Sequence, residues 1–122
     1  MDSSILKART KNFAVSVARF CEDLRPTHSI LAYTRQLIRC SSSVGANYRA
    51  ACRAKSTADF IYKLKIVEEE ADESVYFLEL IQELEPSQAG KVDPLIKEGN
   101  EILAIIVASI NTSLKRKAQS KI

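Results

Sequence analysis

The chain has 122 residues, of which 46% are hydrophobic and 27% charged, and its formal net charge is +3. This length suits one domain with its own core, and this balance excludes a chain that is disordered throughout. Only three glycines and three prolines occur, which favours long helices over a turn-rich all-β fold.

No apolar run is long enough to span a bilayer, and residues 1–11 lack the apolar segment of a signal peptide. The chain is therefore expected to be cytoplasmic and without a membrane partner. The three cysteines, Cys21, Cys40 and Cys52, are widely spaced and form no C-x-x-C pair. They are expected to be reduced, partly buried thiols.

The first predicted helix covers residues 3–24 and ends before Pro26, because a proline disfavours the α conformation at the preceding residue. Its apolar side chains recur at three- and four-residue steps, namely Leu6, Phe13, Val17, Phe20 and Leu24.

The second predicted helix begins at Thr27 or Ser29, either of which is a suitable N-cap. Residues 41–46 have low helix propensity, but we predict that they stay helical and that their small side chains let another backbone approach closely. The predicted inward stripe of this helix is Ile30, Thr34, Leu37, Ser41, Val44, Tyr48 and Ala51.

The third predicted helix begins after a capping box at residues 56–59 and ends before Pro86. One apolar stripe consists of Phe60, Leu64, Val67, Ala71, Ser74, Leu78 and Ile81, and a second of Tyr62, Ile66, Phe77, Leu80 and Leu84. A bundle core needs only one of these stripes. We therefore predict that the second faces another subunit of a homo-oligomer.

Residues 86–92 are predicted to form a short polar loop, followed by Asp93 as N-cap and Pro94 as the first residue of a fourth helix. Its predicted inward residues are Leu95, Ile102, Leu103, Ile106, Ile110 and Leu114, and residues 115–117 form a basic tail. Four helices with short connections predict an all-α fold over residues 1–122: a single-domain, antiparallel up-down-up-down four-helix bundle.

Charge is segregated along the chain. Residues 1–65 carry 12 Lys and Arg against 4 Asp and Glu, a net of +8, whereas residues 66–101 carry 2 against 11, a net of −9. Residues 102–122 carry 4 basic and no acidic residues. Such a distribution favours a face for a polyanion, or pairing between basic and acidic helices within the fold, and both interpretations stay open.

The acidic run at residues 68–73 raises the question of a metal site, because Glu69 and Glu73 lie one helical turn apart. A carboxylate-bridged di-iron bundle needs Glu-x-x-His pairs on two helices, and the only histidine, His28, lies far away in the sequence. A metal-dependent hydrolase using Glu69, Asp72 and Glu73 is therefore the least favoured function, and no metal site is predicted.

An interhelical salt-bridge ladder explains the same carboxylates better. If the second and third helices form an antiparallel hairpin that turns near residue 54, Arg39 faces Glu70 and Arg35 faces Glu73 or Ser74. A partly buried carboxylate needs such a partner. The predicted ladder consists of Arg35, Arg39, Glu69, Glu70 and Glu73.

Catalytic motifs are lacking in the sequence. The serines at 41–43 have no histidine or second base nearby, and no G-x-S-x-G elbow occurs. The segment 41–47 also lacks the glycine and lysine pattern of a phosphate loop. We therefore predict a protein that is not an enzyme and has no cofactor.

Basic side chains gather around the turn between the second and third helices, and the predicted phosphate contacts there are Arg49, Arg53, Lys55 and Lys63. Cations at this density neutralise phosphates and release counterions. Tyr48 beside them offers a stacking surface. Because no helix-turn-helix, RNP or zinc signature accompanies them, sequence-specific base recognition is not implied. A solvated helix end fits the same residues equally well.

Three segments carry a family resemblance, and they read Arg39-Cys-Ser-Ser-Ser43-Val-Gly-Ala-Asn47, Ser56-x-x-Asp59-Phe60 and Glu68-Glu-Glu-Ala-Asp-Glu73. They resemble the bacterial "four helix bundle protein" family, which includes proteins encoded in intervening sequences of large-subunit ribosomal RNA genes. The accessory variability proteins of diversity-generating retroelements are more distant relatives. The resemblance implies a left-handed bundle that assembles into a ring-like homopentamer with a basic surface. In the retroelement relatives it also implies binding to nucleic acid and to a reverse transcriptase.

The chain departs from the family at one point. Many members carry Asn-Ile-Ala-Glu-Gly where this chain has Asn47-Tyr-Arg49-Ala-Ala51, so any role of that glutamate cannot be transferred. The base gained at Arg49 favours the basic patch. Ser43 and Asn47 match the family motif, and we expect them to hold the junction of the second and third helices together.

We therefore predict a non-enzymatic, oligomeric module that binds RNA or DNA through phosphate contacts or scaffolds a nucleic-acid-handling complex. The alternative is a protein-interaction module that recruits a partner such as a reverse transcriptase without direct nucleic-acid contact.

Overall fold

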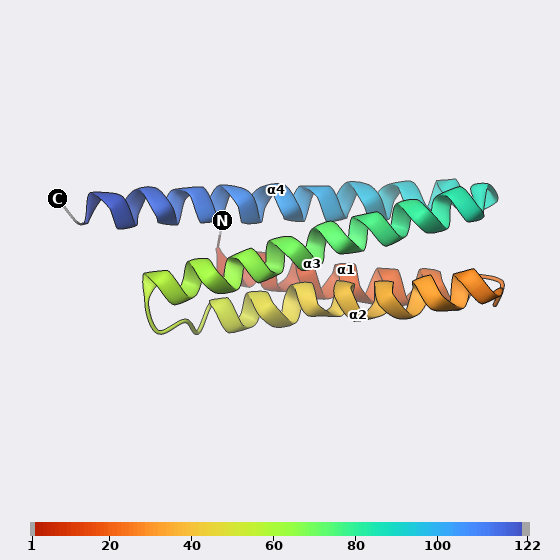
Figure 1. Ribbon diagram of the computed structural model, residues 1–122, viewed down its shortest axis with the longest axis horizontal. Coiled ribbons are helices and arrows are strands. Elements are labelled where there is room, and N and C mark those ends of the chain that lie inside the picture. The colour runs from red at the N-terminus through yellow and green to blue at the C-terminus, as the bar shows by residue number, and fades with distance from the viewer. Residues whose placement is uncertain (1, 121–122) are drawn as a thin grey trace.

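The computed structural model describes residues 2–120, which form four long α-helices and one short 3-10 turn. The elements are α1 (Ser3–Glu22), α2 (His28–Ala51), α3 (Thr57–Leu84), the turn η1 (Pro86–Gln88) and α4 (Ala89–Gln119). In Figure 1, α1 and α3 run in one direction and α2 and α4 in the other. Each helix packs against two neighbours, in the order α1, α2, α3, α4 and back to α1. The prediction of an antiparallel four-helix bundle is confirmed.

Side-chain caps fix three of the helix starts. Asp2 accepts a hydrogen bond from the backbone N–H of Ser4 at 3.0 Å, and Thr27 accepts one from Ile30 at 3.3 Å. Ser56 accepts one from Asp59 at 3.1 Å. Each cap satisfies a backbone donor that has no partner inside the first helical turn. Thr27, rather than Ser29, is therefore the N-cap of α2.

The core runs along the bundle axis and contains apolar side chains from all four helices. Burial of these side chains is the main force that holds the helices together. Every residue of the stripe predicted for α2 is buried. Those that the core buries completely include Phe13, Val17, Leu37, Val44, Leu64, Leu78, Ile102 and Ile106.

The close approach predicted for residues 41–46 occurs between α1 and α2. This segment is helical, and a Cβ atom built on Gly45 would lie 3.1 Å from Thr10 Oγ1 of α1. Small side chains therefore let the two backbones come together at this crossing.

The predicted start of α4 was wrong. The helix begins at Ala89, so Pro94 lies inside it rather than at its first position. The earlier start buries Val92 completely in the core. The Asp93 carboxylate accepts a hydrogen bond from Gln82 Nε2 at 2.5 Å and does not cap a helix. Pro94 removes only one backbone hydrogen bond, the one that its N–H would have donated to Gly90.

Two apolar positions also differ from the prediction. Leu114 is 44% exposed, and Ser113 is buried in its place. The buried residues Ile102, Ile106 and Ile110 are four residues apart, and each such step turns the side chain slightly past a full helical turn. A three-residue step, from Ile110 to Ser113, brings the next side chain back to the core. In the second stripe of α3, Tyr62 is exposed, but Phe77 packs against Tyr33 of α2 with ring centroids 6.1 Å apart.

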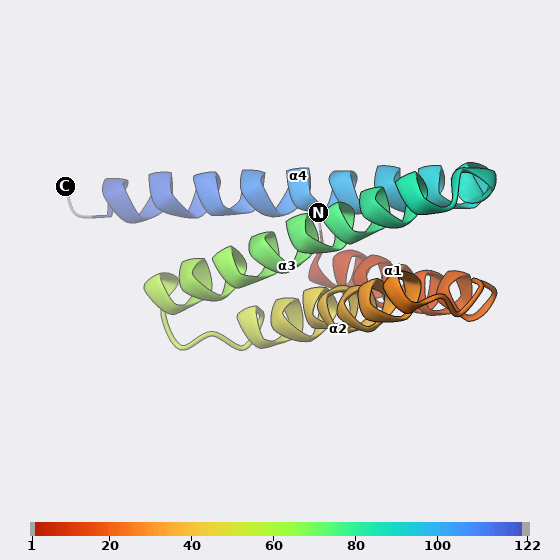
Figure 2. The same ribbon diagram turned by 45° about the vertical axis from the view of Figure 1, so that its right-hand side comes forward.

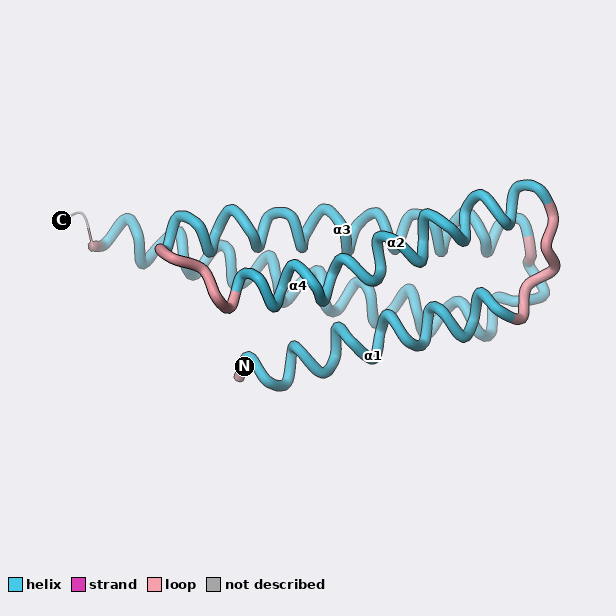
Figure 3. The backbone as a smooth tube through the Cα atoms, turned by 90° about the horizontal axis from the view of Figure 1, so that it is seen from below, coloured by secondary structure: helices cyan, strands magenta, loops and turns pink. Residues whose placement is uncertain are grey.

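The helices differ in length, and this leaves one end of the bundle incomplete. α1 has 20 residues and α4 has 31, and α4 continues well past the N-terminus of α1 (Figures 1 and 3). Figures 1 and 2 also show α3 and α4 separating toward this end. We call it the basic end; here α1 and α3 begin and α2 and α4 finish. Across residues 2–120, no helix combines the length and the apolar character needed to cross a membrane.

Candidate nucleic-acid interface

A surface groove of about 570 Å³ lies between α1 and α2 near the basic end. Its cations are Lys7 and Lys11 of α1 and Arg49 and Arg53 from the end of α2. We call it the basic groove. Most of the other residues that line it are small, among them Ala8, Ala14, Ser42, Gly45 and Ala46, and Val15 adds an exposed apolar side chain.

Helical spacing places the cations in two rows. Lys7 and Lys11 are four residues apart, as are Arg49 and Arg53, so each pair shares one face with a separation of about 6 Å along the axis. Arg53 follows the last residue of α2, and its N–H donates to the carbonyl of Ala50 at 3.1 Å. This bond continues the helical turn and keeps Arg53 in line with Arg49.

The charge of the basic groove is uncompensated within residues 2–120. All four cations are exposed, and none of them forms an ion pair with a described carboxylate. Aspartate and glutamate are also absent from the described residues that line the groove. Such a surface attracts anions and binds them without first breaking an internal salt bridge.

The structure places the four predicted phosphate contacts in three different surroundings. Arg49 and Arg53 share the basic groove, but Lys55 lines a different cavity, between the α2–α3 connection and the end of α4. Lys63 Nζ forms an ion pair with Asp59 Oδ2 at 3.0 Å, one turn earlier on α3. Lys63 is therefore compensated within the chain and is not equivalent to the other three.

Sequence reasoning missed Lys7 and Lys11, which lie about forty residues away from Arg49 in the chain. A signal for them was present. The register argument that paired α2 with α3 applies equally to α1 and α2, which turn at Pro26, and it places the start of α1 beside the end of α2. Thr10 against Gly45 shows this register directly.

Arg39 forms the central part of the predicted ladder. Its Nη2 lies 2.7 Å from Glu73 Oε1 and its Nη1 lies 3.4 Å from Glu70 Oε2. These carboxylates raise the pKa of Arg39, Glu70 having the larger effect. Within residues 2–120, Arg35 and Glu69 form no ion pair.

The ladder is shorter than predicted because Arg35 and Glu69 lack partners among the described residues of the α2–α3 interface. One turn further, α3 presents buried Ser74 and partly buried Phe77, so Arg35 has no carboxylate opposite it. Glu69 is rotated by about 100° from Glu70. It lies at the edge of the groove between α3 and α4 instead.

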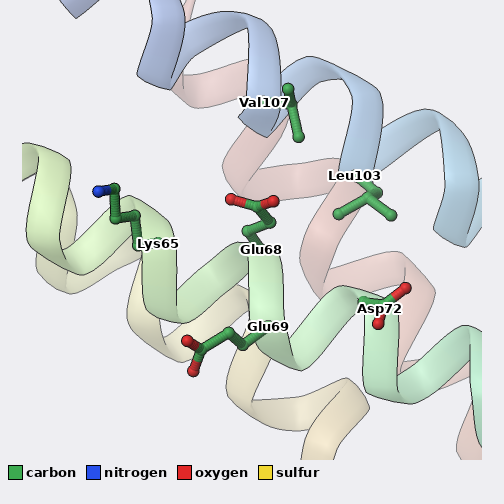
Figure 4. A pocket seen from close by; sticks show the side chains of 6 residues that line it. All are labelled: Lys65, Glu68, Glu69, Asp72, Leu103 and Val107. Carbon is green, nitrogen blue, oxygen red and sulfur yellow. The ribbon is translucent and has the colours of Figure 1, made fainter. Parts of the chain in front are cut away.

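That second groove, of about 300 Å³ between α3 and α4, contains most of the acidic run. Figure 4 shows Glu68 pointing toward α4 near Leu103 and Val107, while Glu69 and Asp72 point away from it in different directions. Because these three carboxylates point in different directions, they are not arranged to bind the same metal ion. Across residues 2–120, no group of three or more His, Cys, Asp or Glu is arranged to hold a metal.

The buried thiols are poorly suited to nucleophilic chemistry. Burial raises the pKa of Cys21 to about 11, and burial likewise raises the pKa of Cys40. A thiol of raised pKa contains little of the reactive thiolate at neutral pH. Cys52 is exposed, at the end of α2.

Comparisons with known proteins agree with this fold. A family model described as 23S rRNA-intervening sequence protein matches residues 3–108. A crystal structure of a protein with unknown function from the S23 ribosomal protein family of Bacteroides thetaiotaomicron is 31% identical, with a TM-score of 0.82. That match covers 91% of this chain and 99% of the other. No match was found among curated proteins.

Proposed function

Because the chain belongs to the family of 23S rRNA-intervening sequence proteins, as its sequence motifs predicted, we propose that it is a non-enzymatic module that binds structured RNA. The observation that carries this proposal is the basic groove: Lys7 and Lys11 face Arg49 and Arg53 across small side chains, with no carboxylate among the described lining residues.

The groove suits a phosphate backbone. A strand that lies along it meets a cation from each wall, and the small side chains between the walls leave room for close approach. Neutralised phosphates release their counterions, which supplies affinity that falls steeply with salt. Exposed lysines and arginines without base-reading partners position a nucleic acid but do not specify its sequence.

RNA is favoured over DNA by the names of the relatives. The matching family model is named after an intervening sequence of 23S rRNA, and the related crystal structure is assigned to a ribosomal protein family. Structured RNA is recognised mainly through its shape, its phosphates and its 2′-hydroxyls. This mode of binding needs no sequence-reading motif.

The proposal is tested by fluorescence anisotropy titration of a structured RNA with the parent protein and with Arg49→Ala/Arg53→Ala. At about 50 mM salt we expect the double variant to bind about 10- to 100-fold more weakly, because two phosphate contacts are lost. The slope of log affinity against log salt should fall by about 2.

A matched control separates the groove from net charge. Arg19→Ala/Arg35→Ala also removes two positive charges, one from α1 and one from α2. Both residues are exposed and have no ion-pair partner within residues 2–120. It should bind RNA like the parent. Equal weakening of both double variants would contradict the assignment to the groove, and no binding of the parent would refute the function itself.

A protein-scaffolding role is the second candidate, because large apolar side chains of α2 and α3 are exposed: Leu31, Ile38, Tyr62 and Tyr76. Such side chains suit an interface with other copies of the chain or with a protein partner. Absence of RNA binding, together with a co-purifying protein or a homo-oligomer, would move the assignment to this role.

A further inference from the structure

The basic end contains a second feature that the basic groove does not use. A cavity of about 470 Å³ opens between the start of α1, the end of α2, the start of α3 and the last turns of α4. At this end α4 extends past the N-terminus of α1 (Figures 1 and 3). The adjoining cavity of about 390 Å³ shares Phe60, Ser113 and Arg116 with it. Together we call them the end cavity.

The lining of the end cavity combines three chemical types. Tyr48 and Phe60 contribute aromatic rings, Ser109 and Thr112 contribute hydroxyls, and Lys55 and Arg116 contribute positive charge. Among residues 2–120, no aspartate or glutamate lines it. A ligand that fits this lining has a flat apolar ring with polar edges and a negative charge.

Helix α4 presents this surface in a regular way. Ile105, Ser109, Thr112 and Arg116 follow one another at four-, three- and four-residue steps, so they lie on one face. The neighbouring stripe, Ile102, Ile106 and Ile110, is buried in the core. This face of α4 therefore carries hydroxyls and a guanidinium beside the buried stripe.

Tyr48 lines the cavity as a largely buried phenol. Only 8% of its surface is exposed. Burial, more than the neighbouring Cys52, raises its pKa to about 12. Its phenol therefore keeps its proton at neutral pH.

We propose that the end cavity binds one unpaired nucleotide of the RNA whose backbone lies in the basic groove. This inference rests on the proposed function. The base packs against Phe60, with the buried ring of Tyr48 beneath it, and meets the hydroxyls of Ser109 and Thr112 with its polar edge. Arg116 and Lys55 contact the phosphate. Each of the two adjoining cavities, of about 470 and 390 Å³, lies within the usual range of small-molecule sites, about 300–1,000 Å³.

The two sites are close enough to be filled by one strand. Leu6 and Tyr48 line the cavity, and their neighbours in sequence, Lys7 and Arg49, line the basic groove. The two sites therefore adjoin each other across the start of α1 and the end of α2. An RNA with an unpaired end next to a stem can therefore occupy both, whereas a blunt duplex can occupy only the groove.

The test compares two RNA hairpins that share one stem, one blunt and one with a 3′ overhang of four nucleotides. We expect the parent protein to bind the overhang form about tenfold more tightly, which is the scale of one base stacked on aromatic side chains. Ala108 is an exposed residue in the cavity lining. Ala108→Trp should fill the cavity, abolish this preference and leave the affinity for the blunt hairpin unchanged.

Ala32→Trp is the matched control, because Ala32 is exposed on α2 at the other end of the bundle. It should keep the preference, and unfolding followed by circular dichroism checks that both variants fold. Equal affinity of the parent for the two hairpins would overturn this inference and leave the proposed function intact. No binding of either hairpin would overturn both.

Adenosine monophosphate as a competitor distinguishes an RNA end from a free nucleotide. Since a lone nucleotide lacks the groove contacts, we expect it to displace the overhang hairpin only at concentrations far above the affinity for RNA. Tight binding of the mononucleotide to a parent that shows no preference between the hairpins would assign the cavity to a free nucleotide and overturn the RNA assignment.

Discussion

At the scale of single residues, two glycines of α4 show how closely the helices pack. A Cβ atom on Gly99 would lie 2.8 Å from Val75 Cγ2 and 3.4 Å from Phe13 Cζ, whereas one on Gly90 would have no neighbour within 4 Å. At Gly99, α4 therefore packs closely against α3 and α1, whereas Gly90 lies in open space.

These two sites predict opposite effects of the same substitution. Gly99→Ala should destabilise the protein by about 1–3 kcal/mol through overpacking. Gly90→Ala should leave its stability unchanged or raise it by up to about 1 kcal/mol, because alanine favours the helix. Urea denaturation measures both. A loss at Gly90 equal to that at Gly99 would contradict this account, because neither helix propensity nor steric overlap predicts a loss at Gly90.

Asp59 predicts a pH dependence of stability. Its carboxylate accepts a hydrogen bond from the backbone N–H of Lys55 at 3.1 Å and one from Lys63 Nζ at 3.0 Å. The backbone bond, with Lys63 second, lowers its pKa below the ordinary 3.8. Because the folded-state pKa is depressed, the stabilisation is complete above the unfolded-state pKa and is lost as the pH falls through the folded-state value.

Asp59→Asn should therefore be less stable than the parent at pH 7, and the difference should shrink as the pH falls below about 4. Thermal unfolding at a series of pH values measures this. A difference that stays constant down to pH 2 would show that the ionised carboxylate of Asp59 contributes nothing to stability.

At the scale of elements, the sequence predicted a helix correctly where its capping residue and its apolar, core-facing pattern indicated the same boundaries. In α2, a clear N-cap at Thr27 precedes a regular apolar stripe, and the stripe is buried as predicted. In α4 the signals conflict. Asp93-Pro94 has the form of a helix start, but burial of Val92 requires helix before it. A strong local motif therefore gave way to core packing, which the sequence alone does not show.

In the candidate site, likewise, residues that are close in the sequence could be predicted, and residues brought together by helix packing could not. Arg49 and Arg53 were singled out because basic side chains gather in the sequence around the turn between α2 and α3, and this closeness does not depend on how the helices pack. Lys7 and Lys11 belong to another helix, so their place beside Arg49 depended on the α1–α2 register. The charge compensation of Lys63 was readable in advance, since Asp59 precedes it by four residues on the same helix.

At the scale of the whole molecule, the antiparallel topology turns segregation of charge along the sequence into segregation along the long axis. α1 and α3 begin, and α2 and α4 end, at the same end of the bundle (Figure 1). That end gathers basic residues from all these segments, among them Lys7, Lys11, Arg49, Arg53, Lys55 and residues 115–117. The opposite end carries carboxylates, among them Glu79, Glu83, Glu85, Asp93 and Glu98, and the acidic run at residues 68–73 lies in the middle of α3.

Pairing between basic and acidic helices also occurs, but it uses only part of the charge. Arg9 of α1 pairs with Glu98 and Glu101 of α4, and Arg39 of α2 pairs with Glu70 and Glu73 of α3. The side chains of the basic groove take no part in these bridges within residues 2–120. In our proposal the remaining field steers a polyanion toward the basic end.

The central claim is that RNA occupies the basic groove, and lysine footprinting tests it most directly. The protein is acetylated with and without saturating structured RNA, and the extent of modification at each lysine is measured by mass spectrometry. Lys7 and Lys11 are exposed in the groove, whereas Lys91 and Lys97 are exposed on the first turns of α4 at the opposite end. The account predicts that RNA protects Lys7 and Lys11 and leaves Lys91 and Lys97 modified at the rate of the free protein. Equal protection of both pairs, or protection of Lys91 and Lys97 alone, would contradict it.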